Sequence, residues 1–302
     1  MTWDVVGVGA SCLDHVCRMP VFPAAGTDRS KIRLTSESRM CGGQTATALA
    51  ACQSFGLRTK YVGTVGLDED GARICRELQA SGIDVADVLH MPDVPTATAT
   101  ILIDGSGDRL VLWHRDPRLI TDPARLPLDA IGSARLVHVD DVDEAAAIGA
   151  AKAARAAGAA VTCDIDHVTA RTGELLSHVS MPIFAEHLPR LLTGESDTER
   201  ALRILRGRHP GILVVTLGQR GAAALEGDAF VHAPAFSIEA VDTTGAGDVF
   251  RAGFIRAFLT GLPLVDMLRM ANAAAAAKCM RLGSMGGVPA FDDVRALLSR
   301  TH

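Results

Sequence analysis

Residues 241–253 read VDTTGAGDVFRAG, a glycine-rich turn that leads into a predicted helix. Thr243 or Thr244 is placed to cap the first helical turn. Apolar residues then recur at three- and four-residue spacings, which predicts a helix with one apolar face. These residues are Val249, Phe250, Phe254, Ala257 and Phe258. Gly261 and Pro263 end the helix.

The turn combines glycines with a carboxylate at the start of the helix. Small residues let the backbone approach a ligand, and the free N–H groups and dipole of a helix start favour an anion. An anion hole of this kind stabilises a transition state by ~3–4 kcal/mol. Asp248 could take a proton from a hydroxyl beside that anion, which accelerates a reaction by roughly 100- to 10,000-fold. The pattern indicates phosphoryl transfer to an alcohol, although a helix start with glycines for turning and an aspartate for capping would also explain it.

The longer string DTTGAGDVFRAGF closely resembles the C-terminal signature of the ribokinase-like (phosphofructokinase-B) carbohydrate kinases. The resemblance runs from Val5 to Pro289. It implies one kinase domain over residues 1–302, with a three-layer α/β/α fold, a mainly parallel central sheet and a small β-sheet lid. It also implies ATP and Mg²⁺ as cofactors and Asp248 as the catalytic base. The anion hole would be formed by the backbone of Gly245, Ala246 and Gly247.

Composition limits the class of protein. The 302 residues are 48% hydrophobic and 22% charged, enough for one large α/β domain or two smaller ones. No stretch reaches about 18 apolar residues, and no basic segment precedes the first apolar run, so we expect neither a membrane span nor a signal peptide. Seven scattered cysteines fit a reducing cytoplasm. The net charge of −5, without a basic run, disfavours nucleic acid as a partner.

The N-terminal strand predicted over residues 3–8 runs into the sequence GVGASC. The third glycine of a dinucleotide-binding fingerprint is missing, and residues 14–20 alternate like a strand, so a nicotinamide-binding domain is not expected. The family resemblance instead places a sugar-binding aspartate after this strand, which here is Asp14. A simple turn aspartate is the alternative.

A second glycine pair, Gly42 and Gly43, opens an alanine-rich helix. The resemblance implies that this pair contacts the sugar, together with Thr47, where the family commonly has Asn. Residues 96–104 and 109–114 alternate in polarity around a hairpin turn at 105–108, whereas residues 21–40 are polar and irregular. By resemblance, residues 12–40 and 96–115 form the lid, with 12–19 and 32–40 beside the hairpin. The lid would cover the sugar and pair two copies as a homodimer.

Strands and helices alternate along the rest of the chain, which predicts a parallel sheet with crossover helices. The predicted strands are 58–65, 135–140, 159–164 and 212–217, and the helices 144–157 and 197–208. Ligands of such sheets lie beyond the C-terminal ends of the strands. The residues at these ends are Asp140, Asp141, Asp164, Asp166, Thr216 and Gly218.

The loop TLGQRG, residues 216–221, matches the nucleotide loop of the family. The resemblance places Thr216, Gly218 and Gly221 near the phosphates or ribose of ATP. Asn272 would lie near the adenine, in a helix predicted over 267–279, although a solvent-facing Asn is equally compatible. No GxxxxGK[ST] motif occurs, so the chain is not a P-loop kinase.

The chain departs from the family where many members carry an Asn-x-x-Glu element that organises magnesium. Ala185 and Leu188 stand at these two positions. Two alternatives are open: Glu186 partly replaces that element, or magnesium is held mainly by ATP phosphates and water, with Asp164 or Asp166 nearby. By resemblance, Asp242 and Thr244 would bind a monovalent cation such as K⁺.

The substrate is the least determined feature. Residues 276–289 resemble the fructose- and sulfofructose-kinase-like branch of the family. Carboxylates cluster where the far end of the sugar should lie, namely Asp140, Asp141, Asp143 and Glu144. Carboxylates bind neutral hydroxyls and repel anions. Arg115 is the only obvious positive charge that would offset theirs. We therefore expect a small uncharged sugar such as ribose or fructose. The alternatives are a nucleoside kinase and a non-catalytic binding protein of the same fold.

Overall fold

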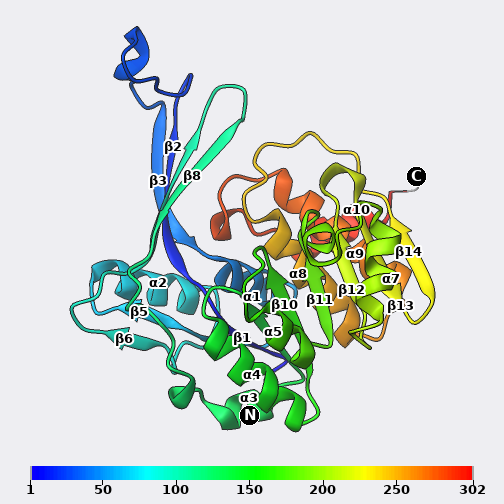
Figure 1. The fold of residues 1–302 in the computed structure, drawn as a ribbon. Helices are drawn as coiled ribbons and strands as arrows, with labels where there is room; N and C mark the ends of the chain where they lie inside the picture. The colour runs from blue at the N-terminus through cyan, green and yellow to red at the C-terminus, as the bar shows by residue number, and fades with distance from the viewer. Residues whose placement is uncertain (1, 301–302) are drawn as a thin grey trace.

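The computed structural model describes residues 2–300. Within this range an eight-stranded sheet forms the centre of the molecule (Figure 1). The strands from β4 across to β12 are parallel, and β13 and β14 continue the sheet antiparallel. In spatial order they are β14 (Ala229–Ala233), β13 (Ala222–Glu226), β12 (Leu213–Thr216), β11 (Met181–Phe184), β10 (Ala160–Ile165), β9 (Leu136–Asp140), β1 (Val5–Val8) and β4 (Thr59–Val62).

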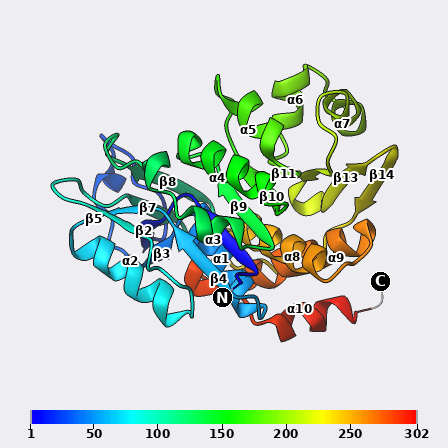
Figure 2. The ribbon, with the colours of Figure 1, turned by 90° about the horizontal axis from the view of Figure 1, so that it is seen from below.

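Helices cover both faces of the central sheet, as Figure 2 shows from below. One layer contains α1 (Gln44–Ser54), α8 (Ala246–Leu259), α9 (Leu264–Cys279) and α10 (Phe291–Leu298). The other contains α3 (Leu128–Gly132), α4 (Glu144–Ala156), α5 (Thr172–His178), α6 (Leu188–Thr193) and α7 (Thr198–Arg206). Because both faces are covered, strands such as β1 are buried at every position. The three-layer, mainly parallel fold predicted from the sequence is confirmed.

A second sheet projects away from this body (Figure 1). Its strands, in spatial order, are β3 (Ser36–Gly42), β2 (Cys12–Arg18), β7 (Thr98–Ile103) and β8 (Arg109–His114). We call this sheet the lid. Its strands lie within residues 12–42 and 98–114, and β3 begins at Ser36 and ends at Gly42, later than the predicted stretch 32–40. The helix α2 (Glu69–Ala80) and a small sheet of β5 (Thr64–Gly66) and β6 (Leu89–Met91) lie near its base.

Two strand predictions needed correction. The predicted strand 58–65 divides at Gly63 into β4 and β5, which belong to different sheets. A Cβ at Gly63 would lie 2.2 Å from the Tyr61 hydroxyl oxygen and 2.7 Å from the Gly9 carbonyl oxygen, so the crossing requires glycine. The strand β11 was not predicted. Within residues 2–300, no helix has the length and hydropathy of a membrane span.

Candidate active site

A cavity of about 680 Å³ lies between the lid and the C-terminal edge of the central sheet. Five of the predicted site residues line it, together with carboxylates that follow β9 and β10. The predicted residues are Asp14, Gly43, Thr244, Gly245 and Asp248, and the further carboxylates are Asp141 and Asp166. Ligand sites at this edge of a parallel sheet follow from the topology.

The start of α8 presents free backbone donors to this cavity. Gly245 is the N-cap residue, in the left-handed conformation with φ of 78°. Neither threonine caps the helix with its side chain, so that prediction was wrong. The N–H of Ala246 is taken by the Thr243 carbonyl, whereas the N–H groups of Gly245 and Gly247 meet no acceptor in the described chain. Unfilled donors at a helix N-terminus are what an anion hole requires.

Asp248 lies in the first turn of α8, half-buried and lining the cavity. Burial raises the pKa of its carboxyl, and the carboxylates of Asp166 and Asp14 raise it further against the opposing charge of Arg251, to about 7. A carboxylate with a pKa near neutrality is suited to accept a proton in the physiological range. Its position and its pKa therefore agree with the predicted base.

Asp14 points into the same cavity from the lid strand β2 and is only 4% exposed. It accepts hydrogen bonds from the Ser284 hydroxyl at 2.6 Å and the Cys12 thiol at 3.2 Å. A Cβ at Gly42 would lie 2.1 Å from an Asp14 oxygen, so glycine at 42 makes room for this carboxylate. Gly43 is the N-cap residue of α1 with φ of 99° and lines the cavity. The glycine pair thus shapes this part of the cavity, as its position before a helix suggested.

Thr47 and Asp140 do not line the cavity. Thr47 is fully buried in α1 and packs beneath Gly245, and its hydroxyl has no partner in the described residues. Asp140 is fully buried, and its carboxylate accepts bonds from the Thr45 hydroxyl and the Ala10 N–H at 2.7 and 2.6 Å. The geometry therefore gives Asp140 a structural role, holding the turn after β1, instead of the sugar contact expected from the sequence.

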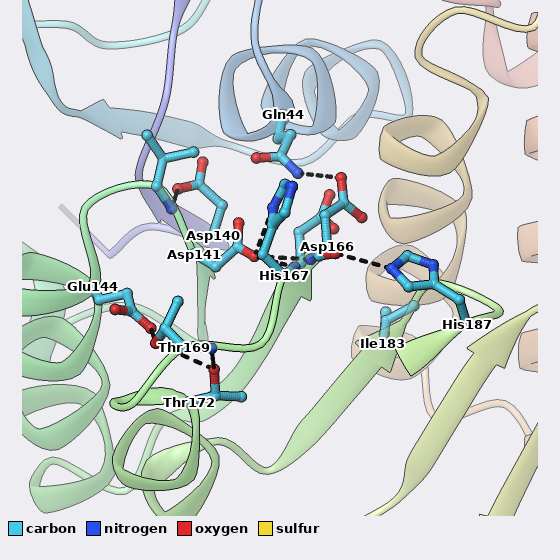
Figure 3. A network of polar contacts seen from close by, with 12 residues as sticks. Gln44, Asp140, Asp141, Glu144, Asp166, His167, Thr169, Thr172, Ile183 and His187 are labelled. Carbon is cyan, nitrogen blue, oxygen red and sulfur yellow. Dashed lines mark hydrogen bonds and ion pairs between the residues drawn. The ribbon is translucent and has the colours of Figure 1, made fainter. Parts of the chain in front are cut away.

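Figure 3 shows how the loop after β10 is held. The Asp141 carboxylate accepts the N–H groups of Asp166 and His167, both at 2.8 Å. Gln44 donates to the Asp166 carboxylate at 2.9 Å, and the His187 ring bonds the Asp166 carbonyl at 3.1 Å. These bonds fix Asp166 at the cavity wall. The Asp141 carboxylate oxygen that accepts them is engaged by the backbone of this loop.

The remaining carboxylates of the expected cluster have partners of their own. Asp143 pairs with the Arg115 guanidinium at 2.8 Å, and both side chains are mostly buried. Asp164 pairs with Arg251, a buried guanidinium one turn after Asp248. Arg251 belongs to the glycine-rich motif of residues 241–253, but its partner Asp164 comes from β10, and no local sequence pattern indicates this pairing.

A second cavity of about 650 Å³ lies near β12 to β14, beside the predicted nucleotide loop. Leu217, Gln219 and Arg220 of the loop line this cavity, whereas Thr216, Gly218 and Gly221 do not. Asn272 is 5% exposed, and its amide donates to the carbonyls of Ala233 and Pro234 at 2.9 and 3.1 Å. Those bonds hold the chain after β14. Asn272 therefore does not face solvent, and its NH₂ group is already engaged by the backbone.

Ala185 and Leu188, which stand at the two positions of the missing Asn-x-x-Glu element, lie in apolar surroundings. Leu188 is fully buried in α6 and Ala185 packs against the same core. Glu186 is exposed and forms an ion pair with Arg220 outside the first cavity, so it does not replace the missing element there. The carbonyl of Asp242, expected to bind a monovalent cation, accepts a bond from the Lys278 ammonium at 3.3 Å. Thr244 lines the first cavity, where its hydroxyl accepts from Arg109 of the lid.

The cavity lies at the C-terminal edge of a parallel sheet and is covered by a lid. It contains a helix start with unfilled donors and an adjacent carboxylate, which are the parts that phosphoryl transfer to a small alcohol needs. The family model of the pfkB family carbohydrate kinases matches residues 9–290, and the chain belongs to this family. It is therefore an ATP-dependent phosphotransferase, acting on a sugar or a nucleoside.

Individual relatives are similar over nearly their whole length. A nucleoside kinase from Methanothermobacter thermautotrophicus is 30% identical over 95% of this chain and 92% of its own. A ribokinase from Bacillus subtilis is 27% identical over 98% of this chain and 99% of its own. The crystal structure of a putative ribokinase from Agrobacterium tumefaciens superposes with a TM-score of 0.91 and 30% identity, covering both chains fully. These relatives differ in the substrate that their names give.

Proposed function

We propose that this chain transfers the γ-phosphoryl group of ATP to a hydroxyl of an uncharged sugar unit, with Asp248 as the general base. The supporting observation is that Gly245 and Asp248, at the start of α8, line one cavity, and that the N–H groups of Gly245 and Gly247 meet no acceptor in the described residues. A hydroxyl placed between them would have a proton acceptor on one side and an anion site on the other.

In the proposed step the substrate oxygen forms a bond to the γ-phosphorus as its proton passes to Asp248. The bond between the γ-phosphorus and the bridging oxygen breaks, and ADP leaves with that electron pair. The N–H groups at the start of α8 bind the phosphoryl oxygens, which carry the charge of the transition state. Asp14 and Gly43 orient the sugar, and the lid excludes water.

Magnesium is expected with ATP in this family. Within residues 2–300, no three His, Cys, Asp or Glu side chains converge as metal ligands. Mg²⁺ bound to phosphates keeps several waters and needs only one or two carboxylates. Asp166 fits that role, because it lines the cavity and its backbone is held by Asp141 and His187. When bound, the ion would neutralise phosphate oxygens.

An uncharged substrate follows from the charges of the cavity wall. The carboxylates of Asp14, Asp141, Asp166 and Asp248 line it. Arg115 is paired with Asp143, and Arg109 is the one lining arginine without an ion pair in the described residues, so the carboxylates outnumber it. A like charge next to such a wall is repelled. An assay of ribose, fructose, related ketoses and sugar acids with ATP tests this, and turnover of acids alone would contradict it.

The rate should depend on pH through Asp248. Its pKa is raised to about 7, so the carboxyl is protonated below that pH and cannot accept the substrate proton. We expect kcat/KM to rise about tenfold per pH unit below pH 7 and to level off above it. Rates measured from pH 5 to 9 with saturating magnesium would show this limb. A profile that is flat between pH 5 and 7 would contradict the assignment.

We infer that two copies pair through the lid. Leu110 and Leu112 on its edge strand β8 are 50% and 60% exposed. Such an apolar edge is commonly covered by a partner. A monomeric mass by light scattering at micromolar concentration would contradict this pairing.

A nucleoside is the second candidate substrate, and the lid favours it. Four apolar side chains of the lid line the cavity beside its polar residues, namely Ala99, Ile101, Val111 and Trp113. Trp113 is 74% exposed, and a planar aromatic ring facing a cavity suits stacking against a base. A nucleoside would place its ribose at the carboxylates and its base against Trp113.

Substitution of Trp113 separates the two candidates. If the substrate is a nucleoside, Trp113→Ala should raise its KM roughly tenfold, because base stacking contributes about 1–3 kcal/mol. Ile204→Ala is the control, since Ile204 is an exposed apolar residue of α7, outside the lid, that lines neither cavity. Equal KM values for adenosine or inosine in the two variants, or turnover of ribose alone by the wild type, would exclude the nucleoside.

A further inference from the structure

Lys278 carries a buried charge whose hydrogen-bond partners are both backbone carbonyls. It lies in the last turn of α9, and its side chain is fully buried. The ammonium donates to the Asp242 carbonyl at 3.3 Å and to the Arg281 carbonyl at 3.1 Å. No carboxylate oxygen in residues 2–300 lies within 4.0 Å of it. Lysine is rarely buried without an ion-pair partner, because desolvation of its charge is costly.

The surroundings of the ammonium form a site for a cation. The C-terminal end of α9 carries the negative end of the helix dipole. The Asp242 carboxylate is also buried and close enough to oppose the lowering of the Lys278 pKa that burial causes. Backbone carbonyls that replace a hydration shell are the ligands that proteins use for potassium.

This site holds together two loops of the active site. Asp242 begins the turn into α8, and its carboxylate accepts the N–H groups of Thr244 and Gly283 at 2.8 Å each. The second loop carries Ser284, whose hydroxyl binds Asp14. Ser284 also lies beside Gly245, because a Cβ built there would be 3.4 Å from the Ser284 Cα. A cation between these loops would therefore position both the anion hole and the partner of Asp14.

We propose that the Lys278 ammonium is the built-in monovalent cation of this site, filling the place that the sequence assigned to K⁺ through Asp242 and Thr244. A free potassium ion beside the ammonium would be repelled by its charge, and both carbonyls already accept from Lys278. Lys278 is a positioning residue, since it reaches the reacting groups only through the two loops. The expected change in kcat rests on the proposed kinase function. The expected change in unfolding temperature is independent of that function.

The test compares the wild type and Lys278→Ala in choline chloride and in KCl at equal ionic strength. The wild type should show the same kcat and the same unfolding temperature in both salts. Lys278→Ala should lose about 10- to 100-fold in kcat in choline, because displaced loops misplace the reacting groups. KCl or ammonium chloride should restore part of that loss and raise the unfolding temperature of this variant alone. Lys152→Ala, an exposed lysine paired with Glu174, is the control and should match the wild type.

Two results would overturn the proposal. One is a saturable increase in the wild-type rate or unfolding temperature with K⁺, which would show that the ion binds despite Lys278. The other is a Lys278→Ala variant with wild-type kcat and stability in choline. If Lys278→Ala does not fold, the same measurements on Lys278→Met, together with the response of the wild type to K⁺, test the proposal. A wild type that phosphorylates no acceptor would refute the kinase function, whereas the response of its unfolding temperature to K⁺ would still test the site.

Discussion

Asp248→Asn should lower kcat by at least about 100-fold, since the variant keeps the shape of the side chain but cannot accept the substrate proton. Binding of ATP and acceptor should change little, because the N–H groups of the anion hole belong to the backbone. Initial rates with a coupled ADP assay and binding by calorimetry measure the two effects. Asp266→Asn is the matched control, as Asp266 lies in the first turn of the neighbouring helix α9.

The stability of Asp248→Asn separates lost chemistry from lost structure. The folded-state pKa of Asp248, about 7, lies above the ordinary value of 3.8. The stability gained from the protonated carboxyl is therefore present in full below pH 3.8 and is lost as the pH rises through 7. At pH 8 the native wild type carries an ionised carboxylate at a cost that the amide avoids. We expect the variant to unfold at the same temperature as the wild type or higher, and turnover comparable to wild type would remove Asp248 as the base.

Arg251→Met should destabilise the fold by about 3–5 kcal/mol, because it leaves the buried Asp164 carboxylate without its counterion. The side chains of Arg251 and Asp164 are only 4% and 2% exposed. Urea unfolding followed by circular dichroism measures the change. In the double variant with Asp164→Asn much of the loss should return, since no uncompensated charge is then buried.

A surface ion pair provides the comparison for Arg251. Arg203 pairs with Glu199 on α7, with side chains 45% and 42% exposed. Arg203→Met should cost no more than about 1 kcal/mol. Arg251 also lowers the pKa of Asp248, so where Arg251→Met still folds, the acidic limb of its rate profile should move to higher pH. Equal losses of stability in the two variants would contradict the account of the buried pair.

The sequence predicted the central sheet and α8 because their signals are local. Buried β-branched runs mark strands such as β1, and the spacing of apolar residues marks the helix. It missed β11 because that strand contains Pro182, which cannot donate a hydrogen bond and is rare in central strands. The cap of α8 was also wrong, since the conformation of Gly245, not a hydroxyl, ends the turn.

The site was predictable in position but not in detail. Successive residues of a strand point to opposite faces, so the pattern could place Asp140 and Asp141 at the edge of the sheet without showing that Asp141 faces the cavity. Lys278 looked like one residue of an alanine-rich helix, and its partner Asp242 lies 36 residues away. Contacts of this kind come from tertiary packing, which no single sequence segment encodes.

A crystal structure with a non-hydrolysable ATP analogue and an accepted sugar or nucleoside tests the central claim most directly. We predict that the terminal phosphate accepts bonds of about 3 Å from the N–H groups of Gly245 and Gly247. The acceptor hydroxyl should lie between that phosphorus and Asp248, at about 2.6–3.2 Å from its carboxylate. A triphosphate bound away from the start of α8, or an acceptor hydroxyl out of reach of Asp248, would contradict the account.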